Sequence, residues 1–303
     1  MIFSEFTQNK RKLKDFPELK HNIKKFVKDK KIIMMLSGGN DSATAVSLLK
    51  ELDLNVELCV HFYHDWSWKL HKEEASKIAE SLNIPLKFHY IGDEIKRRVI
   101  NSKGKNVCRI CKDIMKAECL KIAKENNIEV IATGDTATER ISGPIMEYLN
   151  KYGLSFDNME LAPVPGRIAG EGVLFLRPLI RIRYEDVDKV SKYYDISMKR
   201  VGEANYKLRE GCPVQYINPD AIVTGKLLND AYCVNKIATD IARSHGFKAS
   251  VFAPSLSIAT IPQKEEYMNL VKDELGKNGY PIGEIAEFPY HTNTLKLVPN
   301  KEE

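Results

Sequence analysis

The sequence predicts an α/β fold, a doubly wound and mainly parallel sheet with a small α+β appendage at its C-terminal end. Two features of the 303 residues support this prediction. Short apolar segments alternate with segments in which apolar residues recur every three or four positions, as strands and covering helices do in parallel α/β domains. One apolar segment also runs through a glycine turn directly into a helix, a junction typical of phosphate-binding sheets.

Four strands and three helices follow from these patterns. The strands are short and apolar, at residues 31–36, 56–63, 86–90 and 130–133. The helices between them are expected at residues 42–52, 71–82 and 111–126. Right-handed crossovers between parallel strands produce a doubly wound sheet. Ligands bind such a sheet beyond the carboxyl ends of its strands, which places the crevice at the loops after Leu36, Tyr63 and Thr133.

The turn after the first strand has the groups that a bound phosphate needs. Its residues are Ser37, Gly38, Gly39, Asn40, Asp41 and Ser42. The glycines let the backbone approach an anion, the serines offer hydroxyl donors, and the following helix start points its N–H groups outward. Asp41 can hold a magnesium ion or cap the helix. The turn has neither the Gly-Lys-Ser/Thr ending of a Walker loop nor a third glycine for a dinucleotide fingerprint, and a plain Ser/Gly-rich turn is the alternative.

These six residues resemble the pyrophosphate-loop signature Ser-Gly-Gly-x-Asp-Ser of the ATP pyrophosphatase superfamily. The resemblance implies an adenine nucleotide alpha hydrolase-like fold that binds ATP and Mg²⁺. It also implies cleavage between the α- and β-phosphates, with adenylation of a carbonyl oxygen. Asp41 is then a catalytic residue, while Leu36 and Phe62 contact the nucleotide, with backbone groups near Phe62 reading adenine. Simple strand residues are the alternative for His61 and Phe62.

A second nucleotide motif of the same superfamily is matched in part. The residues after the fourth strand include Gly134, Asp135, Thr138 and Glu139, where the family motif is Gly-His-Asn-x-Asp-Asp. Gly134 is retained and Asp135 occupies the histidine position. Glu139 can replace a missing aspartate as a magnesium ligand, because either carboxylate supplies hard oxygen. An ordinary acid near a helix start is the alternative.

Three of the six cysteines form a pattern that metal centres use. Cys108 and Cys111 form a C-x-x-C pair, and Cys212 follows much later, between a glycine and a proline. A C-x-x-C turn brings two thiolates within reach of one metal centre, but the pair alone fits a redox dithiol, half a zinc site or part of an iron–sulfur cluster. Cysteines are also often small core hydrophobes. That is the preferred interpretation of the remaining three: Cys59, Cys119 and Cys233.

Together with the pyrophosphate loop, the three cysteines resemble the iron–sulfur tRNA thiolation enzymes, the tRNA 2-thiocytidine and 2-thiouridine synthetases. The resemblance implies that Cys108, Cys111 and Cys212 hold a [4Fe-4S] cluster with one open iron, which binds hydrosulfide as the nucleophile. A cysteine persulfide is an alternative. The partners implied are tRNA and a sulfur donor, which is sulfide, a persulfide or a carrier protein. Homodimers are common in that family, so a homodimer is among the expected assemblies.

Two further segments bear on the resemblance. An Arg-Pro-Leu sequence begins at Arg177 and precedes a charged helix start, as in the family. The thiouridine enzymes carry a nucleotide-binding lysine after the C-x-x-C pair. In this sequence Lys112 and Lys116 are the candidates to replace it. The zinc-ribbon pairs that flank those enzymes have no counterpart in this sequence, which weakens assignment to the thiouridine branch.

The charge pattern permits a nucleic-acid partner without demanding one, because the net charge is +5. The first 30 residues combine many lysines with spaced apolar residues, as in an amphipathic helix with a cationic face. That face could contact tRNA phosphates or could be a solvated face. A second basic cluster precedes the C-x-x-C pair, at Lys96, Arg97, Arg98, Lys103 and Lys105.

Three regions are predicted from these observations: a basic helical segment at residues 1–30, a catalytic ATP-binding domain at 31–216, and an α+β appendage at 217–303. The appendage should contain helices near 221–244 and 263–278, a strand near 249–252 and a short strand pair within 281–298. The sequence has no signal peptide and no apolar stretch long enough to cross a bilayer. A cytoplasmic protein without membrane contact is therefore expected.

The resulting prediction of function is ATP-dependent sulfur transfer to a tRNA base through a [4Fe-4S] cluster. Two other classes stay open. One is an ammonia-using ATP pyrophosphatase ligase whose cysteines hold structural zinc. The other is a noncatalytic nucleotide- or RNA-binding relative, which the incomplete second motif would suit. Thiolation of a small metabolite is a variant of the first class.

Overall fold

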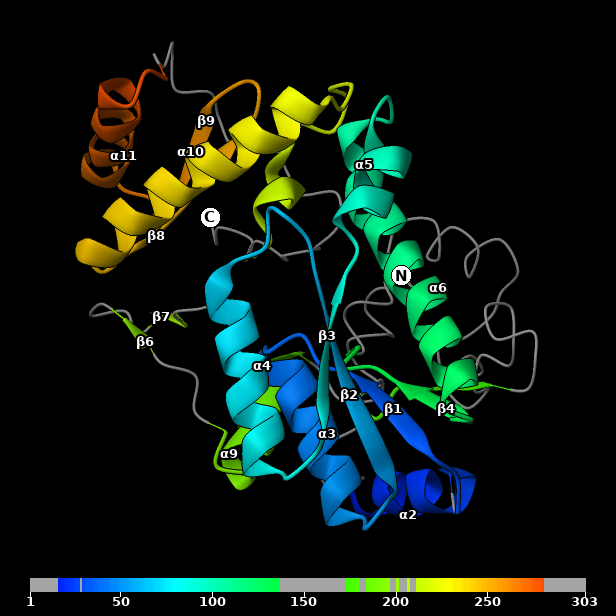
Figure 1. Cartoon of the computed structure of the whole chain (residues 1–303). Coiled ribbons are helices and arrows are strands. Elements are labelled where there is room, and N and C mark those ends of the chain that lie inside the picture. The colour runs from blue at the N-terminus through cyan, green and yellow to red at the C-terminus, as the bar shows by residue number, and fades with distance from the viewer. Residues whose placement is uncertain are drawn as a thin grey trace, which may run out of the picture.

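The centre of the molecule is a five-stranded parallel sheet with the order β3-β2-β1-β4-β5 (Figure 1). Its strands are β1 (Ile32–Met35), β2 (Val56–Tyr63), β3 (Leu86–Tyr90), β4 (Val130–Ala132) and β5 (Leu174–Leu176). The computed structural model describes residues 16–27, 29–136, 173–179, 184–196, 200–201, 206–207 and 211–280. From β1 the chain winds to β2 and β3 on one side and to β4 and β5 on the other. The predicted doubly wound α/β fold is confirmed.

Helices cover both faces of this sheet (Figure 1). On one face lie α3 (Asn40–Glu51), α4 (Lys69–Ser81) and α9 (Tyr184–Tyr193), and on the other lies α6 (Val107–Glu125). Successive strand side chains point to opposite faces. Ile32 and Met34 therefore pack with α3, α4 and α9, whereas Ile33 packs with α6. Both faces of β1 are thus buried, which explains its uninterrupted apolar sequence.

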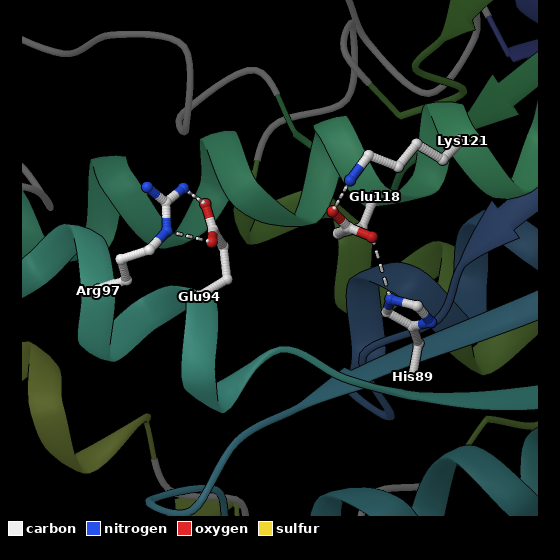
Figure 2. Close-up of polar contacts among 5 residues, drawn as sticks. All are labelled: His89, Glu94, Arg97, Glu118 and Lys121. Carbon is white, nitrogen blue, oxygen red and sulfur yellow. Dashed lines mark hydrogen bonds and ion pairs between the residues drawn. The ribbon is translucent and has the colours of Figure 1, made fainter.

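The edge strand β3 is linked to α6 through polar contacts at the surface (Figure 2). His89 Nε2 lies 3.3 Å from a carboxylate oxygen of Glu118, which also pairs with Lys121 one turn later. On the neighbouring helix α5 (Gly92–Val99), Arg97 forms two hydrogen bonds to Glu94, of 2.8 and 2.6 Å. Each such exposed pair stabilises the fold by about 1 kcal/mol at most. The His89–Glu118 contact joins β3 to α6, whereas the other two pairs each lie within one helix.

The basic N-terminal segment contains α2 (Phe16–Val27), whose buried Ile23 and Val27 join the core beneath α3. Its Lys24 and Lys25 are exposed. Lys20 forms an ion pair with Glu51, which is the last residue of α3. Since α3 begins at the glycine turn and is roughly 18 Å long, α2 lies at the opposite end of the sheet from that turn.

The C-terminal region has a core of its own. Helices α10 (Gly225–Ser244) and α11 (Glu265–Lys277) pack against an antiparallel hairpin of β8 (Lys248–Phe252) and β9 (Ser257–Ile261). The aromatic rings of Phe247 and Tyr267 stack with centroids 4.2 Å apart. The buried amide of Asn235 donates to Val251 O and accepts from Val251 N, at 2.8 and 2.9 Å. These bonds satisfy polar groups that would otherwise be costly in the core.

Residues 217–223 connect this region to the sheet domain through backbone hydrogen bonds. On one side, backbone bonds of 2.8 to 2.9 Å join them to residues 101–105, including Gly104 N to Ala221 O. On the other side, Asn218 N donates to Ala253 O, at 2.8 Å. A Cβ at Gly104 would lie 2.2 Å from Asn218 O, so the close approach requires glycine.

Several expectations from the sequence need correction. The Cys108–Cys111 pair is helical, because α6 begins at Val107, where the sequence suggested a turn. Cys233 is exposed, so its interpretation as a core residue is wrong, while Cys59 and Cys119 are buried as predicted. The sequence patterns did not reveal α5, β5 or β9. The strand pair expected within 281–298 lies outside the described residues.

The remaining short elements are the antiparallel pair β6 (Arg200–Val201) and β7 (Tyr206–Lys207) and the 3₁₀ turns η2 (Gly104–Asn106) and η4 (Pro213–Tyr216). Among the helices of the described chain, none combines the length and the apolar character needed to span a bilayer.

Substitution of Gly104 by alanine should destabilise the protein by about 1–3 kcal/mol, because the new methyl group overpacks a backbone contact. The matched control is Gly225→Ala at the start of α10, where an added Cβ meets no atom within 4 Å. This control should stay within about 1 kcal/mol of the wild type. Urea denaturation measures both. Equal stability of the two variants would contradict the tight docking of residues 217–223.

Candidate nucleotide and thiol site

The glycine turn between β1 and α3 adopts a conformation that its sequence requires. Gly38 has a φ of +76°, and a Cβ there would lie 2.4 Å from His71 O in α4. Positive φ together with backbone contact leaves glycine as the fitting residue. Gly39 then precedes α3 in an extended conformation, and Ala43 N donates to Gly39 O at 2.9 Å to close the first helical turn.

Two serines hold this turn in shape. The hydroxyl groups of Ser37 and Ser42 are 3.0 Å apart. Ser42 Oγ also accepts a hydrogen bond from Ser37 N at 3.2 Å and donates one to Gly39 O at 3.0 Å. Asp41, in the first turn of α3, faces the adjoining cavity. The helix start directs its N–H groups and the positive end of its dipole to the same place, as anion sites do.

A cavity of about 260 Å³ lies over this turn. Its walls come from the ends of three neighbouring strands and from α6. The turn contributes Leu36, Ser37, Gly39, Asp41 and Ser42. The strand β2 contributes Val60 and Phe62, and the segment after β4 contributes Thr133, Gly134 and Asp135. The cavity thus lies at the switch point of the sheet, between β1 and β4, where the topology predicts a ligand.

The segment after β4 packs very closely on the glycine turn. A Cβ at Gly134 would lie 2.7 Å from both Cα and N of Ser42. Next to it, Asp135 accepts a 2.9 Å hydrogen bond from Thr133 Oγ1 and lies 3.3 Å from Arg177 Nε. The Arg-Pro-Leu segment after β5 therefore reaches the cavity wall by pairing with Asp135. Glu139, the other acid of this motif, lies outside the described residues.

Helix α6 supplies the fourth wall through Lys112, Met115 and Lys116. Burial lowers the pKa of Lys116, the Asp135 carboxylate raises it, and Arg177 and Lys112 lower it. A partly desolvated ammonium beside a phosphate-binding turn is suited to an anionic ligand, which would restore its pKa. From the sequence, Lys112 and Lys116 are only candidates to replace the nucleotide-binding lysine of the related enzymes.

Cys108, Cys111 and Cys212 come together near the N-terminal end of the same helix, next to its cavity-lining residues. Cys108 and Cys111 lie three residues apart in the first turns of α6, so their side chains share one face. Cys212 immediately precedes η4. Burial raises the pKa of all three thiols, to about 12 for Cys111, and proximity to Cys108 and Cys111 raises that of Cys212 further. Each sulfur is thus within electrostatic range of the other two.

The thiols and the nucleotide cavity share a wall. Phe62 and Met115 line the cavity, and both pack, as Cys111 and Cys212 do, against one apolar cluster that includes Trp66 and Val107. The cysteines themselves do not line the cavity. A group held by the thiols and a ligand in the cavity would therefore border the same apolar cluster.

The placement of the three thiols bears on which kind of metal centre they could hold. Within the described chain, no group of three or more His, Cys, Asp or Glu side chains is placed to hold one metal ion. Ligands of a [4Fe-4S] cluster bind different irons, so their sulfurs stand farther apart than the ligands of a single ion. Three partly buried thiols in mutual range, which a cationic group would stabilise as thiolates, fit that donor set in chemistry.

Two histidines at the end of β2 have distinct positions. His61 is buried and its Nδ1 lies 2.9 Å from Leu36 O, which ties β2 to the end of β1. His64 is also buried, and burial lowers its pKa to about 4, so its ring is neutral at pH 7. His64 Nε2 lies 3.7 Å from Cys212 Sγ. The sequence does not predict a role for His64, because no local pattern connects it to a cysteine 148 positions away.

The second basic cluster is largely paired with acids. Lys96 Nζ lies 2.6 Å from Asp65, and Arg97 pairs with Glu94. Lys103 and Lys105 lie 3.5 and 3.9 Å from Asp220. These pairs reduce the cationic potential near the cysteines, so charge alone does not mark this surface for nucleic acid.

Comparison with known proteins agrees with the loop geometry. The model of a family described as the PP-loop domain matches residues 9–206. The chain belongs to this PP-loop domain family. An uncharacterized protein of Methanocaldococcus jannaschii is 45% identical over 288 residues, which cover 91% of this chain and 98% of that relative.

One solved structure with a partly similar shape is that of the U34-tRNA thiolase NcsA from Methanococcus maripaludis with its [4Fe-4S] cluster. The TM-score is 0.47 at 15% identity, over 91% of this chain and 86% of that one. This likeness is too distant to carry over chemistry.

Replacement of Gly134 by alanine should weaken ATP binding about tenfold or more, because the methyl group would displace the start of α3. Gly276→Ala in α11 is the control, since an added Cβ there meets nothing within 4 Å. Isothermal titration with a nonhydrolysable ATP analogue and Mg²⁺ measures both. Unchanged affinity in Gly134→Ala would show that the nucleotide binds elsewhere.

Proposed function

We propose that this protein is an ATP-dependent sulfurtransferase that replaces a carbonyl oxygen of a tRNA base by sulfur. ATP and Mg²⁺ are the nucleotide and metal required, and a [4Fe-4S] cluster is the resident cofactor. The sulfur donor is sulfide, a persulfide or a carrier protein. Membership in the PP-loop domain family supports the nucleotide half of this proposal.

The observation that carries the proposal is that α6 contributes residues both to the nucleotide cavity and to the group of three cysteines. One part of this helix lines the nucleotide cavity through Lys112, Met115 and Lys116, while its first turns bear Cys108 and Cys111 beside Cys212. Phe62 and Met115 line the cavity and pack against the same apolar cluster as Cys111 and Cys212. A base carbonyl placed against these two side chains would face a nucleotide on one side and sulfur on the other.

In the first step, the glycine turn and the start of α3 would bind the phosphates of ATP. Asp41 is the candidate magnesium ligand, since it faces the cavity at the start of α3. The base oxygen attacks the α-phosphorus and pyrophosphate leaves, with charge building on the phosphate oxygens. Lys116 is placed to stabilise that charge as its desolvated ammonium gains an anionic partner.

In the second step, sulfur attacks the activated carbon and AMP leaves with the former carbonyl oxygen. Cys108, Cys111 and Cys212 would hold the cluster. When bound, the cluster would supply the sulfur nucleophile at the level of hydrosulfide. The apolar cluster around the thiols, which includes Ile110 and Trp66, limits access of water to an activated carbon.

The two alternatives are less well supported. Structural zinc requires ligands gathered around one ion, and the described residues hold no such group of three or more. A noncatalytic nucleotide-binding relative would use Lys116 for binding, but it would have no use for three cysteines brought together beside the cavity.

Lys116→Ala should lower the rate of pyrophosphate release about 10²-fold while the fold is kept, because one charge-stabilising donor is lost. Lys121→Ala is the matched control, since this lysine lies on the same helix but is exposed and paired with Glu118. A coupled pyrophosphate assay measures both. Equal rates in the two variants would remove Lys116 from the first step.

The proposed cofactor is tested by anaerobic purification with iron and sulfide analysis and visible absorbance. The intact protein should be brown, and Cys108→Ala, Cys111→Ala and Cys212→Ala should each lose the cluster. Cys233→Ala is the control, because this cysteine is exposed and lies on α10. A colourless protein that contains zinc would contradict the sulfurtransferase and favour the ligase.

A further inference from the structure

We propose that His64 positions Cys212 by donating a hydrogen bond from Nε2–H to the cysteine sulfur. The proposal deepens the proposed function and rests on it only in so far as Cys212 is a cluster ligand. The contact itself is a property of the folded chain. Nε2 of His64 and Sγ of Cys212 lie 3.7 Å apart, within hydrogen-bond range for sulfur.

The tautomer of His64 follows from its other ring nitrogen. The backbone N–H of Trp66 lies 3.2 Å from His64 Nδ1, and an amide N–H can only donate. Nδ1 must therefore be the acceptor, with its lone pair directed at Trp66 N. In a neutral imidazole the proton is then on Nε2, which is the nitrogen that faces Cys212.

Cys212 receives donors from a second direction. Gln215 N, in η4, donates to Cys212 O at 3.1 Å, and the backbone groups of Val214 and Gln215 lower the pKa of the Cys212 thiol. His64 and η4 thus approach Cys212 from two separate segments of the chain. The cysteines of α6 have a different environment, because the charge of Lys112 is what favours their thiolates. Cys212 is thus the sulfur that a side-chain N–H group approaches.

The loop that carries His64 is fixed from several sides. His64 N donates to Ser67 Oγ at 3.0 Å, and Ser67 N donates to His64 O at 2.9 Å. Trp66 Nε1 donates to Asn229 of α10 at 2.9 Å. Trp68 Nε1 donates to Gly211 O at 2.7 Å, immediately before Cys212. One loop therefore orients both the imidazole and the backbone that presents the sulfur.

A hydrogen bond to a ligand sulfur has two measurable consequences. It holds the ligand in place, and loss of such supporting partners typically weakens metal binding about 10- to 100-fold. It also disperses charge on the sulfur, which raises the reduction potential of an iron–sulfur cluster. Both consequences depend on a donor at the Nε2 position and not on the aromatic ring.

The first test needs no cluster. Proton–nitrogen correlation spectra of the full-length protein, labelled with ¹⁵N-histidine, report the tautomer of each of its seven histidines. The His64 signal is assigned by its absence in His64→Gln. It should have the Nε2–H pattern, and Cys212→Ala should shift its Nε2 resonance while Cys233→Ala leaves it unchanged. An Nδ1–H pattern, or no response to Cys212→Ala, would overturn the proposal.

The second test uses the cluster-loaded protein. In His64→Phe, iron loss to a chelator should be about 10- to 100-fold faster and the reduction potential lower. His64→Gln places an amide donor near the Nε2 position and should restore both values toward the wild type. Equal defects in the two variants would indicate a packing role and overturn the proposal. If the wild-type protein never binds a cluster, the proposed function fails, but the histidine spectra still decide the role of His64.

Discussion

The arrangement of the site depends on how α6 packs against the sheet. The buried face of this helix, with Cys119, Ile122 and Ala123, rests on the same sheet face as Ile33 and Ile131. This packing fixes the position of the helix along the strands. Its middle then lies over the ends of β1 and β4, and its first turns lie beyond the sheet, against η4 and α10. A nucleotide cavity and a thiol group are thereby held on one rigid element.

The C-terminal region completes what α6 begins. It supplies Asn229 to the loop after β2 and packs against the apolar cluster beside the cysteines. Residues 217–223 connect it by backbone hydrogen bonds both to the segment before α6 and to β8. Cys212 lies a few residues before this connection. The region therefore fixes the third sulfur relative to the first two, although its own core lies apart from the sheet.

Burial of three neighbouring thiols carries an electrostatic cost, because low dielectric disfavours each thiolate and each thiolate disfavours the next. The structure shows this in the raised pKa values of Cys108, Cys111 and Cys212. Lys112 and the donors around Cys212 offset part of that cost. A cationic centre would offset far more, and its binding would release protons from the thiols.

The sequence predicts those parts of the fold and site that depend on local patterns. The apolar strands and the glycine turn are such patterns, since each reflects a few consecutive residues. Strand β5 and helix α5 were not predicted, because three residues of strand and eight of helix give too little periodicity. Lys116 and His64 acquire their importance from contacts with Asp135 and Cys212, which only the tertiary fold provides. The exposure of Cys233 also depends on which face of α10 packs, and periodicity did not reveal it.

The central claim is that nucleotide activation and sulfur transfer occur across one shared wall, and the stoichiometry of the reaction tests it most directly. The measurement is an anaerobic reaction of cluster-loaded protein with tRNA, ATP and sulfide, in which AMP and thionucleosides are quantified by mass spectrometry. The account predicts one AMP for each sulfur incorporated, with both products dependent on the cluster. AMP formation that requires ammonia, yields no thionucleoside and continues without iron would contradict it.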